Sequence, residues 1–173
     1  MGTNSRIPYH LDLKLVNELA YIPSGMVLDA IQAENESREY GATTFTVMNK
    51  KIKFRVAKVT PTKVGHFVAI WKRVDGVTKP HDEHDPYDFF IISVRDENGF
   101  GQFIFNKSTL IENEIISTEL TKGKRGMRLY PPWVETSNKQ AEKSQKWQCK
   151  HFIKIDTIQG NNYPRIIEEL KKD

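Results

Sequence analysis

Residues 50–73, KKIKFRVAKVTPTKVGHFVAIWKR, carry the clearest fold signal in this sequence. Polar and apolar residues alternate over 51–56, which is the period of a β-strand. The apolar side chains would point to one face of the strand, and the cations would point to the other: Lys51, Lys53 and Arg55. A rigid row of cations suits a polyanion, because a flexible coil would lose entropy to present the same row.

The whole stretch contains no Asp or Glu. A short row of cations taken alone is more commonly the solvated face of a half-buried sheet. A face that serves only solubility usually mixes both signs of charge, so the absence of acids favours a functional patch. We call these residues the first basic cluster: Lys51, Lys53, Arg55, Lys58, Lys63, Lys72 and Arg73.

A second basic cluster lies in TKGKRGMR, residues 121–128, and consists of Lys122, Lys124, Arg125 and Arg128. Glycine in such a loop lets the backbone approach a phosphate and leaves its N–H groups available. A mobile, solvated loop is an equally good interpretation of this cluster taken alone. Two acid-free clusters in one small domain favour a shared binding face over coincidence.

Composition and length indicate one ordinary globular domain. The chain has 173 residues, of which 38% are hydrophobic and 28% charged. No apolar run approaches the roughly 18–20 residues that span a bilayer, and the N-terminus lacks the apolar core of a signal peptide. The single cysteine, Cys149, excludes an internal disulfide and fits a reducing compartment. We expect a cytoplasmic protein.

The charge distribution points to the class of partner. The net charge is only +4, but residues 1–45 are net acidic whereas 50–73 and 122–128 are basic. Such asymmetry favours a polyanion, here DNA or RNA. A membrane surface is less favoured, because the cations fall on strand and loop patterns and not on an amphipathic helix.

The periodicity predicts an α/β (α+β) single domain over 1–173, in which helices flank a mixed, mostly antiparallel central β-sheet. N-terminal helices would occupy 1–40, the sheet core 43–155 and a C-terminal helix 160–173. A capping box at Thr109 and Glu112 predicts a short helix starting there. Longer helices are predicted over 8–21, 26–36, 138–146 and 163–172. Strands are predicted over 43–48, 51–56, 66–73, 89–94, 101–105 and 148–155.

Two further features are candidates for binding. Aromatic rings near the cations can stack on unpaired bases, although such rings more often belong to a core. The candidate rings are Trp71, Tyr130, Trp133 and Trp147. Trp71 is expected in the core, and Trp133, after two prolines, is the ring that we expect to be exposed. The loop over 81–85, HDEHD, has the residue types of a metal site, but its spacing matches neither HExxH nor an EF-hand. An acidic, solvated loop is therefore favoured, and no metal site is predicted.

Several blocks in chain order resemble the MepB family over roughly residues 40–155. They are FRVAKVTPTKVGHFVAIWKR, DFFIISV, GQFIFNKSTL, GKRGMRLYPPW and QAEKSQKWQ. This family consists of small bacterial proteins often encoded beside a multidrug efflux pump and its repressor. The resemblance implies an intracellular α/β protein that binds nucleic acid without an established catalytic activity. It also implies a distant likeness to restriction-endonuclease folds.

That likeness raises a nuclease as the alternative function. A restriction-type nuclease needs an Asp at a strand start and an acid-x-Lys pair on the next strand, and these hold Mg²⁺ and orient water. Asp88 opens DFFIISV, but Gln102 and Ile104 replace the acid and the lysine, and Lys107 lies three residues further on. Glutamine is a poor Mg²⁺ ligand. We therefore expect nucleic-acid binding by both clusters and Trp133, without catalysis or a cofactor. A module that binds an acidic protein is a weaker option.

Overall fold

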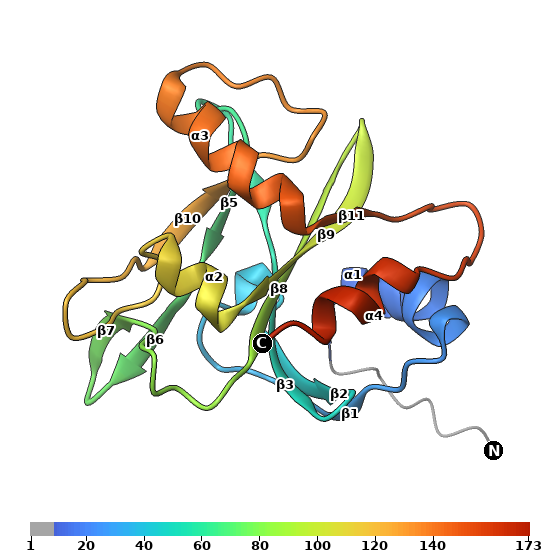
Figure 1. Ribbon diagram of the computed structural model, residues 1–173, viewed down its shortest axis with the longest axis horizontal. Helices are drawn as coiled ribbons and strands as arrows, with labels where there is room; N and C mark the ends of the chain where they lie inside the picture. Colours follow the sequence, from blue (N-terminus) through green and yellow to red (C-terminus); the bar gives the residue numbers. More distant parts are fainter. Residues whose placement is uncertain (1–8) are drawn as a thin grey trace.

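A six-stranded sheet organises the computed structural model, which describes residues 9–173. In spatial order its strands are β1 (Asp29–Ala33), β2 (Thr43–Val47), β3 (Lys50–Val56), β8 (Phe89–Asp96), β9 (Gly99–Asn106) and β11 (Phe152–Lys154). Only β3 and β8 run parallel, and the other neighbours are antiparallel. This confirms a mixed, mostly antiparallel sheet with flanking helices (Figure 1).

An apolar core lies on each face of this sheet. The central strand β8 is therefore buried on both sides. Ile91 belongs to the first core, under α1 (Leu11–Val16) and α4 (Pro164–Leu170), which lie on the same side of the sheet in Figure 1. Phe90 and Ile92 belong to the second core. The apolar run over 89–94 is thus the central strand that its composition predicts.

The second core is covered by a helix and a smaller sheet. The helix is α2 (Lys107–Glu112), which follows β9 directly. The smaller sheet has the order β10-β5-β4, with β4 (Lys58–Val59), β5 (His66–Ala69) and β10 (Gly126–Leu129). The antiparallel pairing of β5 with β10 places Arg128 opposite Phe67 and so brings the two basic clusters together.

The remaining elements are short. They are the π-helical turn η1 (Asn17–Tyr21), the 3₁₀ turns η2 (Ile22–Ser24), η3 (Arg38–Tyr40) and η4 (Cys149–His151), helix α3 (Lys139–Gln148), and the hairpin of β6 (Trp71–Val74) and β7 (Val77–Pro80). The predicted helix over 8–21 corresponds to α1 and η1, and Pro8 lies outside the described residues. Across residues 9–173, no helix is long and apolar enough to cross a membrane.

The predicted helix over 26–36 is wrong. Asp29–Ala33 forms the edge strand β1, which pairs with β2. The spacing of Val27, Leu28 and Ile31 fits a helix, but Val27 is 69% exposed, whereas the other two are only partly buried against the first core. Pairing with the open edge of β2 outweighs the weak local helix pattern, since tertiary context routinely overrides propensity.

Three predicted boundaries also need correction. The helix predicted from Thr109 begins at Lys107, because the Asn106 side chain accepts the Thr109 N–H at 2.8 Å. The strand predicted over 66–73 is divided between β5 and β6 at Ile70, whose N–H donates to the Arg125 carbonyl at 3.0 Å. The strand predicted over 148–155 begins only at Phe152.

A buried ion-pair network connects β3 to the chain just beyond β1. Glu34 accepts hydrogen bonds from Lys53 Nζ and from an Arg55 guanidinium nitrogen, each at 2.5 Å. The Arg55 side chain is only 1% exposed. Burial by itself would raise the pKa of Glu34, but the charges of Arg55 and Lys53 outweigh this effect and hold the pKa below its ordinary value. Glu34 therefore compensates a buried guanidinium.

Replacing Glu34 should destabilise the whole fold. Glu34→Ala leaves the Arg55 charge buried without a counterion, and we expect it to lower the free energy of unfolding by about 3 kcal/mol. Urea unfolding at neutral pH measures this difference. Glu39→Ala, which removes an exposed carboxylate from η3, serves as the control and should change stability by less than about 0.5 kcal/mol. Equal stabilities for the two variants would contradict the assigned role of Glu34.

Candidate nucleic-acid interface

A groove of about 770 Å³ lies between α3 and the strands β5 and β10. Its lining includes Lys63 from the first basic cluster and Lys124 and Arg128 from the second. Tyr130 and Trp147 also line it, and no Asp or Glu is among the described residues that do so. We call this cavity the basic groove. Figure 1 shows α3 lying over the end of the small sheet that contains β10 and β5.

Arg128 holds the two clusters together. A guanidinium nitrogen of Arg128 donates to the backbone carbonyls of Lys63, Val64 and Gly65, at 3.4, 3.2 and 3.4 Å respectively. The guanidinium also lies 5.9 Å from the centre of the Phe67 ring. These contacts fix the loop before β5 against β10. The structure therefore brings Lys63, Lys124 and Arg128 together in one groove.

Gln148 positions α3 against β10. Its side chain, which is buried, accepts the Tyr130 N–H at 2.9 Å and donates to the Arg128 carbonyl at 2.8 Å. These two hydrogen bonds tie the last turn of α3 to the end of β10 and give the groove a rigid base. Sequence reasoning missed Gln148, because a glutamine in a polar helical segment carries no signal that distinguishes a buried partner from a solvated one.

The glycines of the second cluster serve packing within the chain. A Cβ at Gly126 would lie 2.7 Å from the Phe67 ring, and one at Gly123 would lie 2.6 Å from the Ser117 nitrogen. The Gly123 N–H donates to Ser117 Oγ at 2.9 Å. The expectation that this N–H is available for a phosphate is therefore wrong. Lys122, Lys124 and Arg125 are all exposed, so side chains carry the charge of this loop.

The row of three exposed cations on β3 is only partly present. Lys51 is exposed, but the Lys53 side chain is 17% exposed and paired with Glu34, and Arg55 is buried. The Arg55 guanidinium lies 5.5 Å from the centre of the Phe90 ring. The three side chains do point to one face of β3, as the alternation predicts, but other parts of the chain cover this face near Arg55. Arg55 is therefore a structural residue and does not contact phosphate.

The other members of the first basic cluster differ in how exposed and how tightly paired their side chains are. Lys72 is half-buried and pairs with Asp82 and Asp85 at 2.5 and 2.6 Å. Lys58, Lys63 and Arg73 are exposed. Lys58 Nζ lies 4.8 Å from the centre of the Tyr40 ring, and Arg73 lies 5.3 Å from that of Trp71. Of the first cluster, only Lys63 reaches the basic groove.

Trp133 does not present a free ring for stacking. It is half-buried, its indole N–H donates to Asp96 Oδ2 at 2.9 Å, and its ring packs edge-on against Phe152. The prediction that Trp133 is exposed is therefore wrong, because its contacts with Asp96 and Phe152 hold the ring against the sheet. The aromatic residues that line the basic groove are Phe67, Tyr130 and Trp147.

Only two of the three residues of the nuclease alternative lie close together. Asp88 and Lys107 are neighbours, since the Lys107 N–H donates to the Asp88 carbonyl at 3.0 Å. Lys107 Nζ, however, donates to the carbonyls of Glu83 and Asp85. Gln102 pairs with Ser93, roughly 16 Å along the strand from Asp88 at about 3.3 Å per residue. Its buried side chain bonds Tyr21 and Ser93.

The HDEHD loop is solvated only in part, because His81 and Asp85 belong to an internal ion-pair network. His81 is buried, and its Nδ1 lies 2.9 Å from Asp85 Oδ2. The other oxygen of Asp85 accepts from Lys72. Within residues 9–173, no group of three or more His, Cys, Asp or Glu side chains is placed to hold a metal ion.

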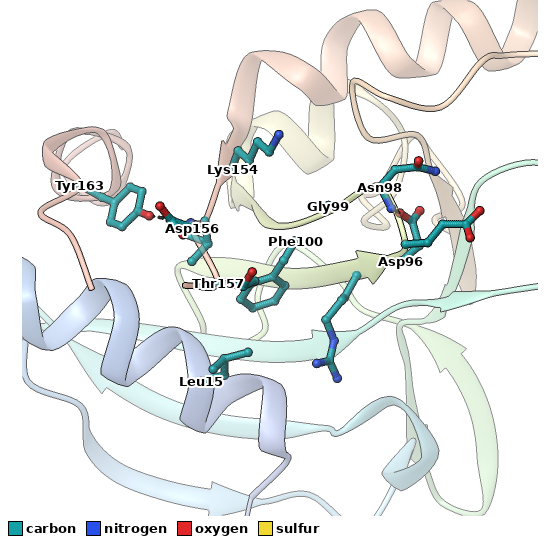
Figure 2. A pocket seen from close by; sticks show the side chains of 12 residues that line it. Leu15, Asp96, Asn98, Gly99, Phe100, Lys154, Asp156, Thr157 and Tyr163 are labelled. Carbon is teal, nitrogen blue, oxygen red and sulfur yellow. Dashed lines mark hydrogen bonds between the residues drawn. The ribbon is translucent and has the colours of Figure 1, made fainter. Parts of the chain in front are cut away.

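A second large cavity, of about 870 Å³, lies at the turn between β8 and β9 (Figure 2). Its lining mixes carboxylates with cations: Asp96, Glu97, Asp156, Arg95 and Lys154. Tyr163 closes one end, where its hydroxyl accepts the Asp156 N–H at 2.8 Å. Because carboxylates outnumber cations here, this cavity suits a polyanion less well than the basic groove does.

Comparisons with known proteins identify the family. A family model described as MepB-like matches residues 34–154. The chain belongs to the MepB-like family. A crystal structure of MepB aligns with a TM-score of 0.73 and 34% sequence identity, covering 84% of this chain and 97% of that chain. No curated protein matches the sequence. The family resemblance predicted from the sequence is thereby confirmed.

The MepB-like match begins at Glu34 and ends at Lys154. It therefore contains the Glu34 ion pairs, both basic clusters and α3, and excludes α1 and α4. The elements that build the basic groove all lie inside this match.

The Asp85 network should make stability depend on pH. Burial opposes ionisation of Asp85, but hydrogen bonds from His81 and Lys72 outweigh it and hold the pKa of its carboxyl below the ordinary value of 3.8. The stabilisation is fully present above that unfolded-state pKa and is lost as the pH falls through the folded-state pKa. We expect Asp85→Asn to be less stable than the parent at neutral pH.

The difference in free energy of unfolding should shrink as the pH falls below about 4, because Asp85 then takes up a proton in the unfolded parent while its carboxyl stays ionised in the folded protein. Urea unfolding across the acid range measures it. Asp75→Asn, in the exposed turn between β6 and β7, is the matched control and should follow the parent curve. A constant difference at every pH would contradict this account.

Proposed function

We propose that this MepB-like protein binds nucleic acid in the cytoplasm, through the basic groove and without catalysis. The observation that carries the proposal is the convergence of Lys63, Lys124 and Arg128 on one groove whose described lining contains no carboxylate. Cations on β10 and on the loops that precede β5 and β10 would neutralise phosphates and release condensed counterions. Contacts to the backbone carry no sequence information, so we expect little sequence preference.

The aromatic lining favours unpaired nucleotides. Tyr130 and Trp147 both line the groove and are partly exposed. Stacking of a base on such a ring requires that the base is unpaired or at a strand end. We therefore expect single-stranded DNA or RNA to bind more tightly than a duplex of the same length. Amide and hydroxyl side chains on α3, such as Gln140 and Ser144, supply further hydrogen bonds in the groove.

The two alternatives predict different outcomes. A divalent-metal nuclease that uses Asp88 gains no support from the positions of Gln102 and Lys107, and it predicts Mg²⁺-dependent cleavage that Asp88→Asn abolishes. A module that binds an acidic protein predicts a complex that excess nucleic acid does not displace. Binding titrations with and without Mg²⁺ therefore separate all three.

Charge reversal in the groove should weaken binding. The double variant Lys63→Glu, Lys124→Glu changes two exposed side chains and leaves Arg128 and its structural hydrogen bonds intact. We expect affinity for single-stranded DNA to fall by roughly tenfold or more at low salt, and the slope of log K against log salt to fall by about two. Fluorescence anisotropy over a salt series measures both quantities.

The matched control is Lys154→Glu, Lys171→Glu, which makes the same change in net charge at exposed positions outside the groove. It should retain most of the affinity. If both double variants lose affinity equally, binding reflects net charge and the groove is not the site. If neither loses affinity, the proposed function is wrong.

A further inference from the structure

A row of lysines lies along the outer side of helix α3, next to the basic groove. Lys139, Lys143 and Lys146 follow one another at spacings of four and three residues, which places them on one face of the helix. Lys150 continues this spacing into η4, directly after α3. All four lysines are exposed. We call these four residues the lysine row.

The lysine row lies opposite the face by which α3 is attached to the rest of the protein. Ala141 and Gln148 are the buried residues of this helix, and each is roughly half a turn away from the lysines at about 3.6 residues per turn. Gln148 makes the two hydrogen bonds that hold α3 on β10. The lysines are therefore not needed to attach the helix.

The charges of the lysine row act against the stability of α3. Lys143 lies four residues after Lys139 and three before Lys146, and like charges at these spacings repel. Lys139 also occupies the first turn, where the helix dipole favours an acidic residue. Glu142 is the acidic residue of this helix.

No ion pair within residues 9–173 relieves this repulsion. Neither Glu142 nor any lysine of the row takes part in one. A helix face that served only solubility would gain stability from paired charges of opposite sign. Local conflicts of this kind are characteristic of functional surfaces, and here they indicate an external anion.

The lysine row is continuous with the basic groove. Lys143 is a neighbour on the helix surface of Gln140, three residues before it, and of Trp147, four residues after it, and both of these line the groove. Lys63 and Lys124 line the groove from the loops on the other side. Figure 1 shows α3 at the edge of the molecule, over the small sheet. An extended anion in the groove can therefore continue over α3.

We propose that a single strand of nucleic acid bound in the basic groove extends over α3, where its phosphates bind the lysine row. This inference rests on the proposed function and adds a second contact surface to it. The row is about 17 Å long, at about 1.5 Å per residue from 139 to 150. A strand that only fills the groove does not reach it, whereas a longer strand neutralises four more charges. Affinity therefore depends on the length of the strand.

Oligothymidylates of two lengths test this inference. Lengths of about four and about sixteen nucleotides bracket the site sizes of common single-strand-binding folds. The row variant replaces exposed lysines by glutamine, which preserves helix propensity: Lys139→Gln, Lys143→Gln, Lys146→Gln and Lys150→Gln. Fluorescence anisotropy over a salt series measures affinity, and circular dichroism verifies that the helices are retained.

The matched control makes the same change in net charge at exposed lysines outside the groove and the row: Lys51→Gln, Lys79→Gln, Lys154→Gln and Lys171→Gln. We expect the row variant to bind the long strand roughly tenfold more weakly than this control at low salt. Its slope of log K against log salt should be smaller by about three, since each phosphate contact of a single strand contributes about 0.7. For the short strand, the two variants should agree within about twofold.

The groove variant Lys63→Glu, Lys124→Glu separates this inference from the proposed function, because it should lose affinity for both lengths. If it does so while the row variant binds the long strand like the control, the groove is the site and the lysine row is not part of it. Equal losses by the row variant on short and long strands would also overturn the inference. Binding of polyglutamate, but of neither oligonucleotide, would assign the row to an acidic protein and overturn both proposals. Failure of the parent to bind any of these probes would do the same.

Discussion

The ion pairs of Glu34 with Arg55 and Lys53 constrain much of this structure. A buried guanidinium is tolerated only with a well-placed counterion, because the loss of hydration is otherwise uncompensated. Glu34 supplies that charge from the residue that follows β1, so β1 must pair with β2 at the sheet edge. This requirement explains why residues 29–33 form a strand despite a spacing of apolar residues that fits a helix.

The same interaction changes the meaning of the basic sequence around β3. Arg55 and Lys53 contribute to folding, and Lys72 is similarly occupied by Asp82 and Asp85. Much of the charge that suggests a polyanion site is therefore compensated inside the molecule. Within the two basic clusters, the remaining positive charge is concentrated in the basic groove, at Lys63 and Lys124 beside Arg128.

The basic groove is built from groups that remain accessible on the surface. It is lined by exposed cations and partly exposed aromatic rings on a base fixed by Gln148, which suits an extended, flexible polyanion.

The sequence by itself determined that a mixed, mostly antiparallel sheet forms, the direction of each side chain on β3, the doubly buried β8 and the family. Each of these depends on periodicity or on residue order, which are local properties. Only the tertiary structure decided that Arg55 is covered, that Lys63 meets Lys124, that Trp133 bonds Asp96 and that Gln102 lies far from Asp88. Alternation shows toward which face a side chain points, but burial and pairing depend on segments distant in the sequence, and those positions follow from packing of the whole chain.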